Sequence, residues 1–228
     1  MRIEAAGIEK WYFRSRKGSN RFYAVQQSDL DLKPGQVTVL TGRSGSGKTT
    51  LMHMMAGLLT PDSGKVLADG QELYEMNDRV LSSFRNQSFG MIPQGADVLP
   101  ELTVMENILL PCGIFRNQKD TSHEEIKQYA GKLLDEMNIL TLSEVRAKEL
   151  SGGERRRVCV ARAMSGKPDV IFADEPTSDL DDDNMHVVLS LLRKAADAGA
   201  AVMIVTHDNE ALDYADVKIR MEEGRLYW

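Results

Sequence analysis

The sequence contains no long apolar run free of charge. Its longest stretch without Asp, Glu, Lys or Arg is 13 residues, Thr49 to Pro61, whereas a membrane-spanning helix needs about 20 apolar residues. The first ten residues, MRIEAAGIEK, also lack the apolar segment of a secretory signal. We therefore expect a cytosolic protein that does not cross a bilayer by itself.

Cysteine and positive charge are both scarce. The 2 cysteines, Cys112 and Cys159, show no metal-ligand or redox spacing, so we expect reduced thiols. The net charge of −6 argues against a nucleic-acid partner, because phosphate backbones bind to basic faces. The short basic runs Arg14–Lys17 and Arg155–Arg157 are interpreted as solvated surface charge.

Apolar strand-like runs alternate with helical patterns, which predicts an α/β fold with a mostly parallel sheet. The runs Val37–Leu40, Val170–Ala173 and Ala201–Val205 are short and continuous, as buried parallel strands are. Apolar residues at helical spacing between Met185 and Ala196 join the last two runs. The helical run Thr50–Leu58 follows the first.

Both ends of the chain read as β structure. Ile3–Phe13 and Phe22–Leu32 flank a polar loop, residues 14–21, and predict an antiparallel portion. Val217–Trp228, with a turn at Glu223–Gly224, predicts a final hairpin. The middle is helical, with a capping box at Ser122–Glu125. We predict one domain, with a core from residues 1–94 and 166–228 and an inserted helical subdomain over about 95–165.

The strongest motif is the loop Gly42–Thr49, which reads G-x-x-x-x-G-K-[ST] and lies between a predicted strand and a predicted helix. Glycines allow backbone N–H groups to surround phosphate oxygens, and the helix N-terminus adds a partial positive charge. Lys48 is expected to bridge the β- and γ-phosphates of a nucleotide, and the Thr49 hydroxyl to bind Mg²⁺.

Acidic residues and a histidine follow the other two buried strands. Asp174 and Glu175 come directly after Val170–Ala173, so they are expected beside the phosphate loop, one holding Mg²⁺ and the other acting as general base. His207 follows Ala201–Val205 and is expected at the same sheet edge, where it can orient water or Glu175. The other three histidines are interpreted as packing or surface residues.

A second anion-binding helix end is predicted at Leu150-Ser-Gly-Gly-Glu154. One chain thus has one nucleotide loop but two phosphate-binding ends. In a head-to-tail pair of chains, the second helix end of each chain can contact the nucleotide held by the loop of the other.

Taken in order, Gly42–Thr49, Gln94, Leu150–Glu154, Asp174–Glu175, Ser178–Asp181 and His207 resemble the ABC ATPase family over nearly the whole chain. The resemblance implies a P-loop NTPase core, and a dimer that closes around two ATPs and drives integral membrane permease subunits. It also implies that Gln94 touches Mg²⁺ and that Tyr12 stacks on adenine, with Trp11 and Phe13 as rivals. The implied ATP contacts are Tyr12, Gly42, Ser44, Gly45, Ser46, Gly47, Lys48, Thr49, Thr50, Ser151, Gly152, Gly153, Glu154 and Asp181.

Within the family, the chain is similar to the lipoprotein-release and macrolide-export branch. The similarity rests on its short length with a single ATP-binding cassette, on the polar loop and on the segment Leu99–Asn107. The chain departs from that branch at Pro93, Ala147 and Asp179. Three alternatives remain open: an ABC ATPase acting on DNA or ribosomes, a P-loop kinase for a small metabolite, and an ATP-binding module that remodels the envelope without moving cargo.

Overall fold

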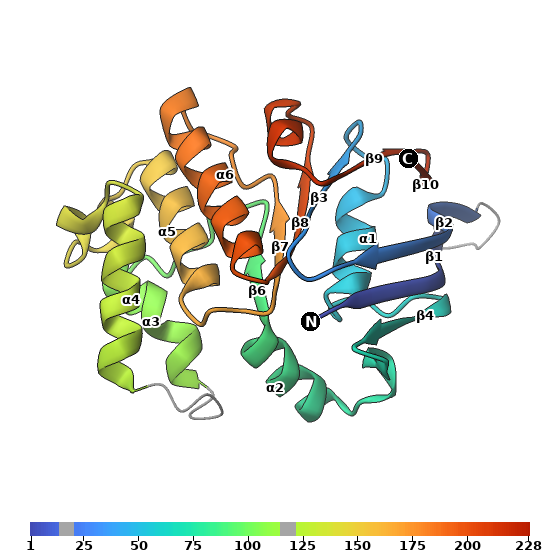
Figure 1. Cartoon of the computed structure of the whole chain (residues 1–228), viewed down its shortest axis with the longest axis horizontal. Coiled ribbons are helices and arrows are strands. Elements are labelled where there is room, and N and C mark those ends of the chain that lie inside the picture. Colours follow the sequence, from blue (N-terminus) through green and yellow to red (C-terminus); the bar gives the residue numbers. More distant parts are fainter. Residues whose placement is uncertain (14–20, 115–121) are drawn as a thin grey trace.

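The computed structural model describes residues 1–13, 21–114 and 122–228 (Figure 1). The polar loop predicted over residues 14–21, which includes the basic run Arg14–Lys17, therefore lies almost wholly outside the described residues.

A six-stranded sheet forms the centre of the fold. Its neighbouring strands are parallel except for the final hairpin, β9–β10. Three of the central strands bury every residue or all but one, which explains why each reads as a continuous apolar run. In spatial order the strands are β10 (Arg225–Tyr227), β9 (Val217–Glu222), β3 (Val37–Thr41), β8 (Ala201–Thr206), β7 (Val170–Asp174) and β6 (Phe89–Ile92).

A four-stranded antiparallel sheet lies at one end of the molecule (Figure 1). The helix α1 (Lys48–Met55) contributes Leu51, Met52, Met54 and Met55 to the apolar core that this sheet shares with the central sheet. The phosphate loop is thus attached to a helix that both sheets hold. The antiparallel strands, in spatial order, are β2 (Arg21–Leu32), β1 (Ile3–Phe13), β4 (Ser63–Ala68) and β5 (Gln71–Glu72).

Helices occupy the opposite end of the molecule, where α3, α4 and α5 lie together (Figure 1). The predicted capping box at Ser122–Glu125 is present and begins α4. The helices are α2 (Asp78–Ser88), α3 (Val104–Ile114), α4 (His123–Glu136), α5 (Gly152–Met164) and α6 (Asp182–Asp197), with short 3-10 turns η1 (Leu73–Glu75), η2 (Leu140–Leu142), η3 (Ala147–Glu149) and η4 (Glu210–Tyr214).

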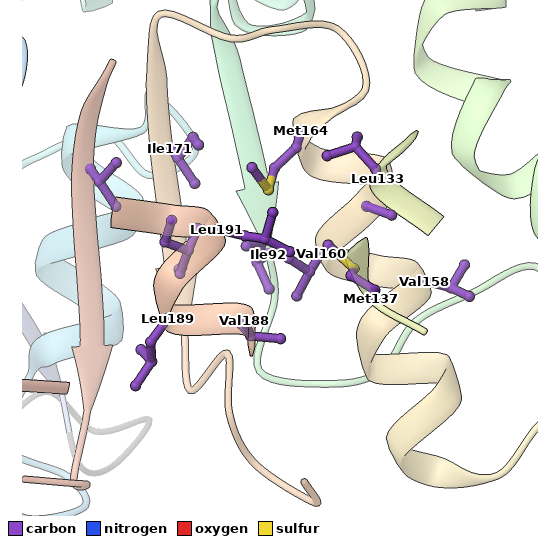
Figure 2. Packing of buried hydrophobic residues seen from close by; sticks show 14 of the residues in the cluster. Ile92, Leu133, Met137, Val158, Val160, Met164, Ile171, Val188, Leu189 and Leu191 are labelled. Atoms are coloured by element: carbon purple, nitrogen blue, oxygen red, sulfur yellow. The ribbon is translucent and has the colours of Figure 1, made fainter. Parts of the chain in front are cut away.

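The central strands alternate between two cores. On β7, Ile171 and Ala173 face the helical end, whereas Val170 and Phe172 face α1, as the period of two in a strand requires. Figure 2 shows the first core, where Ile92 of β6 gathers with Val160 of α5 and Leu191 of α6. This packing fixes α5 against the edge of the sheet.

The fold class is confirmed: a mostly parallel sheet, an antiparallel portion at the N-terminal end and a helical part. The subdomain boundaries at about 95 and 165 stay a prediction. The sequence patterns predict no elements between Leu59 and Pro93, yet this segment forms β4, β5, α2 and β6. No helix in the described ranges is long and apolar enough to span a membrane.

One interpretation of surface charge was wrong. Arg156, read as part of a solvated basic run, is only 1% exposed. It is the first buried residue of α5, one turn before the buried apolar residues Cys159 and Val160.

Candidate functional site

A cavity of about 770 Å³ lies at the carboxyl ends of β6, β7 and β8. Open parallel sheets bind ligands at this edge, where loops leave neighbouring strands together. Its lining brings together most of the predicted site: Tyr12, Ser44, Gly45, Gly47, Lys48, Thr49, Thr50, Gln94, Asp174, Glu175 and His207.

The phosphate loop is packed too tightly for side chains at two of its glycines. A Cβ on Gly42 would collide with the carbonyl oxygen of Met221, and one on Gly47 with that of Ala24. Gly47 also has a φ of 107°, which disfavours other residues. The loop therefore rests directly on the backbone of β9 and β2.

Lys48 points into this loop. Its Nζ donates to the carbonyl oxygens of Gly42, at 2.7 Å, and Arg43, at 3.1 Å, and the residue is only 7% exposed. A largely buried ammonium with neutral partners suits an anion beside it, because burying an uncompensated charge is costly. Ser46 Oγ is buried and has no hydrogen-bond partner among the described residues. Both observations fit a phosphate group in the loop.

Thr49 and Asp174 form an oxygen pair at the cavity floor. Thr49 Oγ1 donates to Asp174 Oδ2 at 2.7 Å. Burial raises the pKa of Asp174, and the Thr49 hydrogen bond opposes this rise. The described residues contain no group of three His, Cys, Asp or Glu side chains that could hold a metal unaided. A hydroxyl and one carboxylate fit Mg²⁺, which usually takes its remaining ligands from phosphates and water.

Glu175 is held by two neighbours of the next strand. Thr206 Oγ1 donates to its Oε2 at 2.9 Å, and His207 Nδ1 lies 2.8 Å from its Oε1. The backbone of Glu175 is left-handed, with a φ of 47°, a conformation that costs free energy for a residue with a Cβ. The carboxylate is thus fixed in position while the His207 side chain stays 75% exposed.

The aromatic wall of the cavity comes from the antiparallel sheet. Tyr12 lines it, whereas Trp11 and Phe13 do not. Trp11 instead stacks on the Arg21 guanidinium, 4.0 Å from the ring centre. Phe22 and Tyr23 also line the cavity and were missed, although Phe22 pairs with Tyr12 in the β1–β2 register. The available signal is the run of consecutive aromatic residues on each strand, Trp11–Phe13 and Phe22–Tyr23.

The segment Leu150–Glu154, called the signature from here on, lies outside this cavity. Ser151 is exposed and caps α5: its Oγ accepts from Glu154 N at 3.3 Å, and Glu154 Oε2 accepts from Ser151 N at 2.7 Å. The hydrogen bond from the Ser151 backbone lowers the pKa of Glu154. Gly152, Gly153 and Asp181 do not line the cavity either, and Asp181 caps α6 through Asn184 N at 2.9 Å. Within one protomer the two helix ends predicted to bind phosphate are therefore separate.

Comparison with known families decides the assignment. The family profile described as "ABC transporter" matches residues 25–178, about two thirds of the chain. The chain belongs to the ABC transporter family.

Relatives within the ABC transporter family match over most of the chain. The lipoprotein-releasing system ATP-binding protein LolD of Syntrophotalea carbinolica is 37% identical over 92% of this chain and 91% of its own length. The LolD protein of Leptospira interrogans is 35% identical over 99% and 93%. The macrolide export ATP-binding/permease protein MacB of Chlorobaculum tepidum is 34% identical over 97% of this chain, which spans 33% of that protein. The predicted resemblance to this branch is confirmed.

A solved ABC cassette has the same fold. The dimeric structure of a post-hydrolysis state of an ATP-binding cassette bound to ADP and Pi has a TM-score of 0.89 and 29% identity, covering 99% of this chain and 97% of its own. The predictions of ATP binding and of ATPase activity are thereby confirmed for this member of the ABC transporter family.

Proposed function

We propose that two copies of this chain pair head to tail around two ATPs and drive integral membrane permease subunits. The observation that carries this proposal is the position of Ser151. It begins a helix, faces solvent and lies outside the cavity that collects the phosphate loop, Asp174 and Glu175. A helix end that binds anions but cannot serve its own cavity suits the cavity of a partner.

Within the cavity, each predicted residue has a proposed role. Mg²⁺ bound to ATP would neutralise charge on the β- and γ-phosphates. Thr49, Asp174 and Gln94 would hold it. Tyr12 would stack on adenine. The phosphates would be held by Gly42, Ser44, Gly45, Ser46, Gly47, Lys48, Thr49 and Thr50 from one chain and by Ser151, Gly152, Gly153, Glu154 and Asp181 from the other.

Hydrolysis is assigned to the pair Glu175 and His207. Glu175 accepts a proton from the attacking water, and its position is fixed by Thr206 and His207. His207 is 75% exposed beside this carboxylate, where it can orient Glu175 or, in place of that contact, donate to the γ-phosphate. Gln94 completes the catalytic set from the end of β6.

ATP is sufficient to close such a pair. Shifting a pair from 1:99 to 99:1 closed needs about 5.5 kcal/mol of differential binding. Hydrogen bonds to a charged group contribute about 1.5–3 kcal/mol each, so a few bonds at each of two sites are enough. Hydrolysis separates the γ-phosphate from the nucleotide and releases the partner's helix end.

The names of the relatives suggest which kind of transport the ATPase drives. LolD is named for lipoprotein release, and MacB for macrolide export. We therefore propose a chain held at the inner face of the cell membrane by a permease that extracts or exports lipoprotein, peptide or drug. An ATPase that remodels the envelope without moving cargo is the second candidate, and the identity of the co-purifying membrane subunit separates the two.

Glu175→Gln tests the catalytic role. The variant keeps shape but loses the base, so we expect a stable ATP-bound dimer with turnover reduced about a hundredfold or more. Size-exclusion chromatography with ATP measures the dimer, and phosphate release measures turnover. Hydrolysis at the parental rate would show that Glu175 is not the base.

A further inference from the structure

Arg156 is the largest fully buried side chain of the described residues, and the hydrogen-bond partners of its guanidinium there include no carboxylate. Nη1 donates to the carbonyl oxygen of Pro93 at 2.7 Å, and Nη2 to that of Gln94 and to Ser178 Oγ. Its Nε has no hydrogen-bond partner in the described ranges. All its acceptors are neutral oxygens.

This arrangement is costly for a residue that only fills space. Removing a guanidinium from water costs several kcal/mol, and an apolar side chain of similar volume is often as stabilising. Charge-assisted hydrogen bonds recover part of that cost. Because the guanidinium is planar and its N–H donors are rigidly arranged, these bonds also fix the relative positions of the acceptors. We therefore expect the main contribution of Arg156 to be the position that it gives to its three acceptors, and not the volume that it fills in the core.

The acceptors belong to two catalytic segments. Gln94 lines the cavity at the end of β6. Ser178 closes the turn that begins at Glu175, with its N donating to Glu175 O at 3.2 Å. The guanidinium thus joins the backbone of one catalytic residue to the turn that carries another.

The same side chain stands on the helix that presents the signature. Arg156 lies in the second turn of α5, and Ser151 caps that helix. The first turn also packs closely on the segment after Ser178, because a Cβ on Gly153 would lie 3.2 Å from Asp179 O. The Arg156 guanidinium therefore connects three segments: helix α5, the backbone at Gln94 and the Glu175–Ser178 turn.

We infer that Arg156 is a positioning residue for ATP hydrolysis, which holds the Gln94 backbone and the Glu175–Ser178 turn in register with the signature helix. The inference rests on the proposed function. It acts through Gln94 and Glu175, so its loss displaces Mg²⁺ and water contacts and leaves the phosphate loop intact. A misplacement of about 1 Å can lower a rate as much as a hundredfold.

The test compares three variants of the full chain with a matched control. Arg156→Met removes the charge, Arg156→Lys keeps it without the fork, and Ser178→Ala removes one acceptor. The control is Arg85→Met. Like Arg156, Arg85 donates to neutral oxygens, Gly57 O and Ser82 Oγ, but it is half-buried and lies outside the cavity. The readouts are kcat, the ATP dissociation constant, the Mg²⁺ concentration at half-maximal rate and the unfolding midpoint.

We expect Arg156→Met to lower kcat about tenfold or more and raise the half-saturating Mg²⁺ concentration severalfold, with ATP affinity within about threefold. Arg156→Lys should be intermediate, and combining it with Ser178→Ala should cost less than the two single losses together. Arg85→Met should lower only the unfolding midpoint.

Should Arg156→Met fail to fold, Arg156→Lys and Ser178→Ala carry the test. Parental kcat and Mg²⁺ dependence in both would overturn the inference and leave the proposed function standing. A parental chain that hydrolyses no ATP, in its paired or permease-bound form, would overturn the proposed function and this inference with it.

Discussion

Neighbouring aromatic residues on β1 have different surroundings. Tyr12 lines the cavity and is 38% exposed, with its ring centre 5.9 Å from that of Phe22. Trp11 is turned away and covered by Arg21. The Arg21 guanidinium lies between Trp11 and the cavity lining at Tyr23. Of the Trp11 and Tyr12 rings, that of Tyr12 is therefore the one placed to contact a base in the cavity.

Tyr12→Ala should therefore weaken ATP binding about tenfold, because stacking of a base on an aromatic ring is worth about 1–3 kcal/mol. Trp11→Ala is the matched control and should change affinity less than about twofold. Calorimetric titration with ATP measures both. An equal loss in the two variants would contradict the assignment of Tyr12.

The sequence was most informative at residues whose chemistry depends on local spacing. Lys48 and Thr49 end the loop that leaves β3, and Asp174 and Glu175 lie at the end of β7. Parallel strand ends meet at one edge of the sheet. Arg156 could not be interpreted this way, because its burial depends on β6 and on the Glu175–Ser178 turn, both distant in sequence.

At the scale of elements, the entry into β3 is fixed by a carboxylate from the far end of the chain. Asp216 Oδ2 accepts from Val37 N at 2.8 Å and from the Arg193 guanidinium. Arg193 also donates to Gly35 O at 3.0 Å. Its hydrogen bond holds the pKa of Asp216 below the usual range. The strand that leads into the phosphate loop is thus anchored to α6.

A lowered pKa in the folded state means that Asp216 stabilises the fold above its unfolded pKa, and that this contribution is lost as pH falls through the folded value. Asp216→Asn should lower the free energy of unfolding by about 1 kcal/mol at pH 7, and the difference from the parental chain should shrink below about pH 4. Denaturant titrations at pH 7 and at pH 3 measure the free energy of unfolding of both proteins.

The exposed Asp213→Asn, from the same 3-10 turn region, is the control and should change stability little at either pH. A constant deficit for Asp216→Asn from pH 7 to pH 3 would rule out the ionic contribution.

Elements were predictable where burial is complete or where a turn is marked by its residues. The strands β3, β7 and β8 and the final hairpin were located to within one or two residues, because continuous apolar runs or a Glu-Gly turn mark them. The edge strand β6 has only four residues, two of them half-buried, so it has neither a run nor a clear alternation. Helix α2 was missed although Asn77 caps it, accepting from Val80 N.

At the scale of the whole molecule, the separation of Ser151 from the cavity predicts complementation between defective chains. Lys48→Ala removes the phosphate-loop cation, and Ser151→Asp keeps a helix cap but places negative charge toward the partner's γ-phosphate. Each variant alone should be inactive.

Mixing the two variants one to one should restore up to about a quarter of the parental phosphate release, because half of the randomly formed twofold pairs contain one intact site of two. A mixture no more active than the separate chains would show that each site is built within one protomer. Mixing two Lys48→Ala preparations is the matched negative control.

The sheet order has a consequence for how the protein is made. β3, which leads into the phosphate loop at residue 42, pairs with β8 and β9, at residues 201–206 and 217–222, and Gly224 N donates to Ser46 O at 3.0 Å. About 160 residues separate the end of β3 from the start of β8, so during synthesis β3 and the loop are made well before the strands that pair with them. Non-local pairings of this kind form slowly. A nascent chain should acquire nucleotide affinity only near the end of translation, which protects a growing polypeptide from pairing around ATP before it is complete.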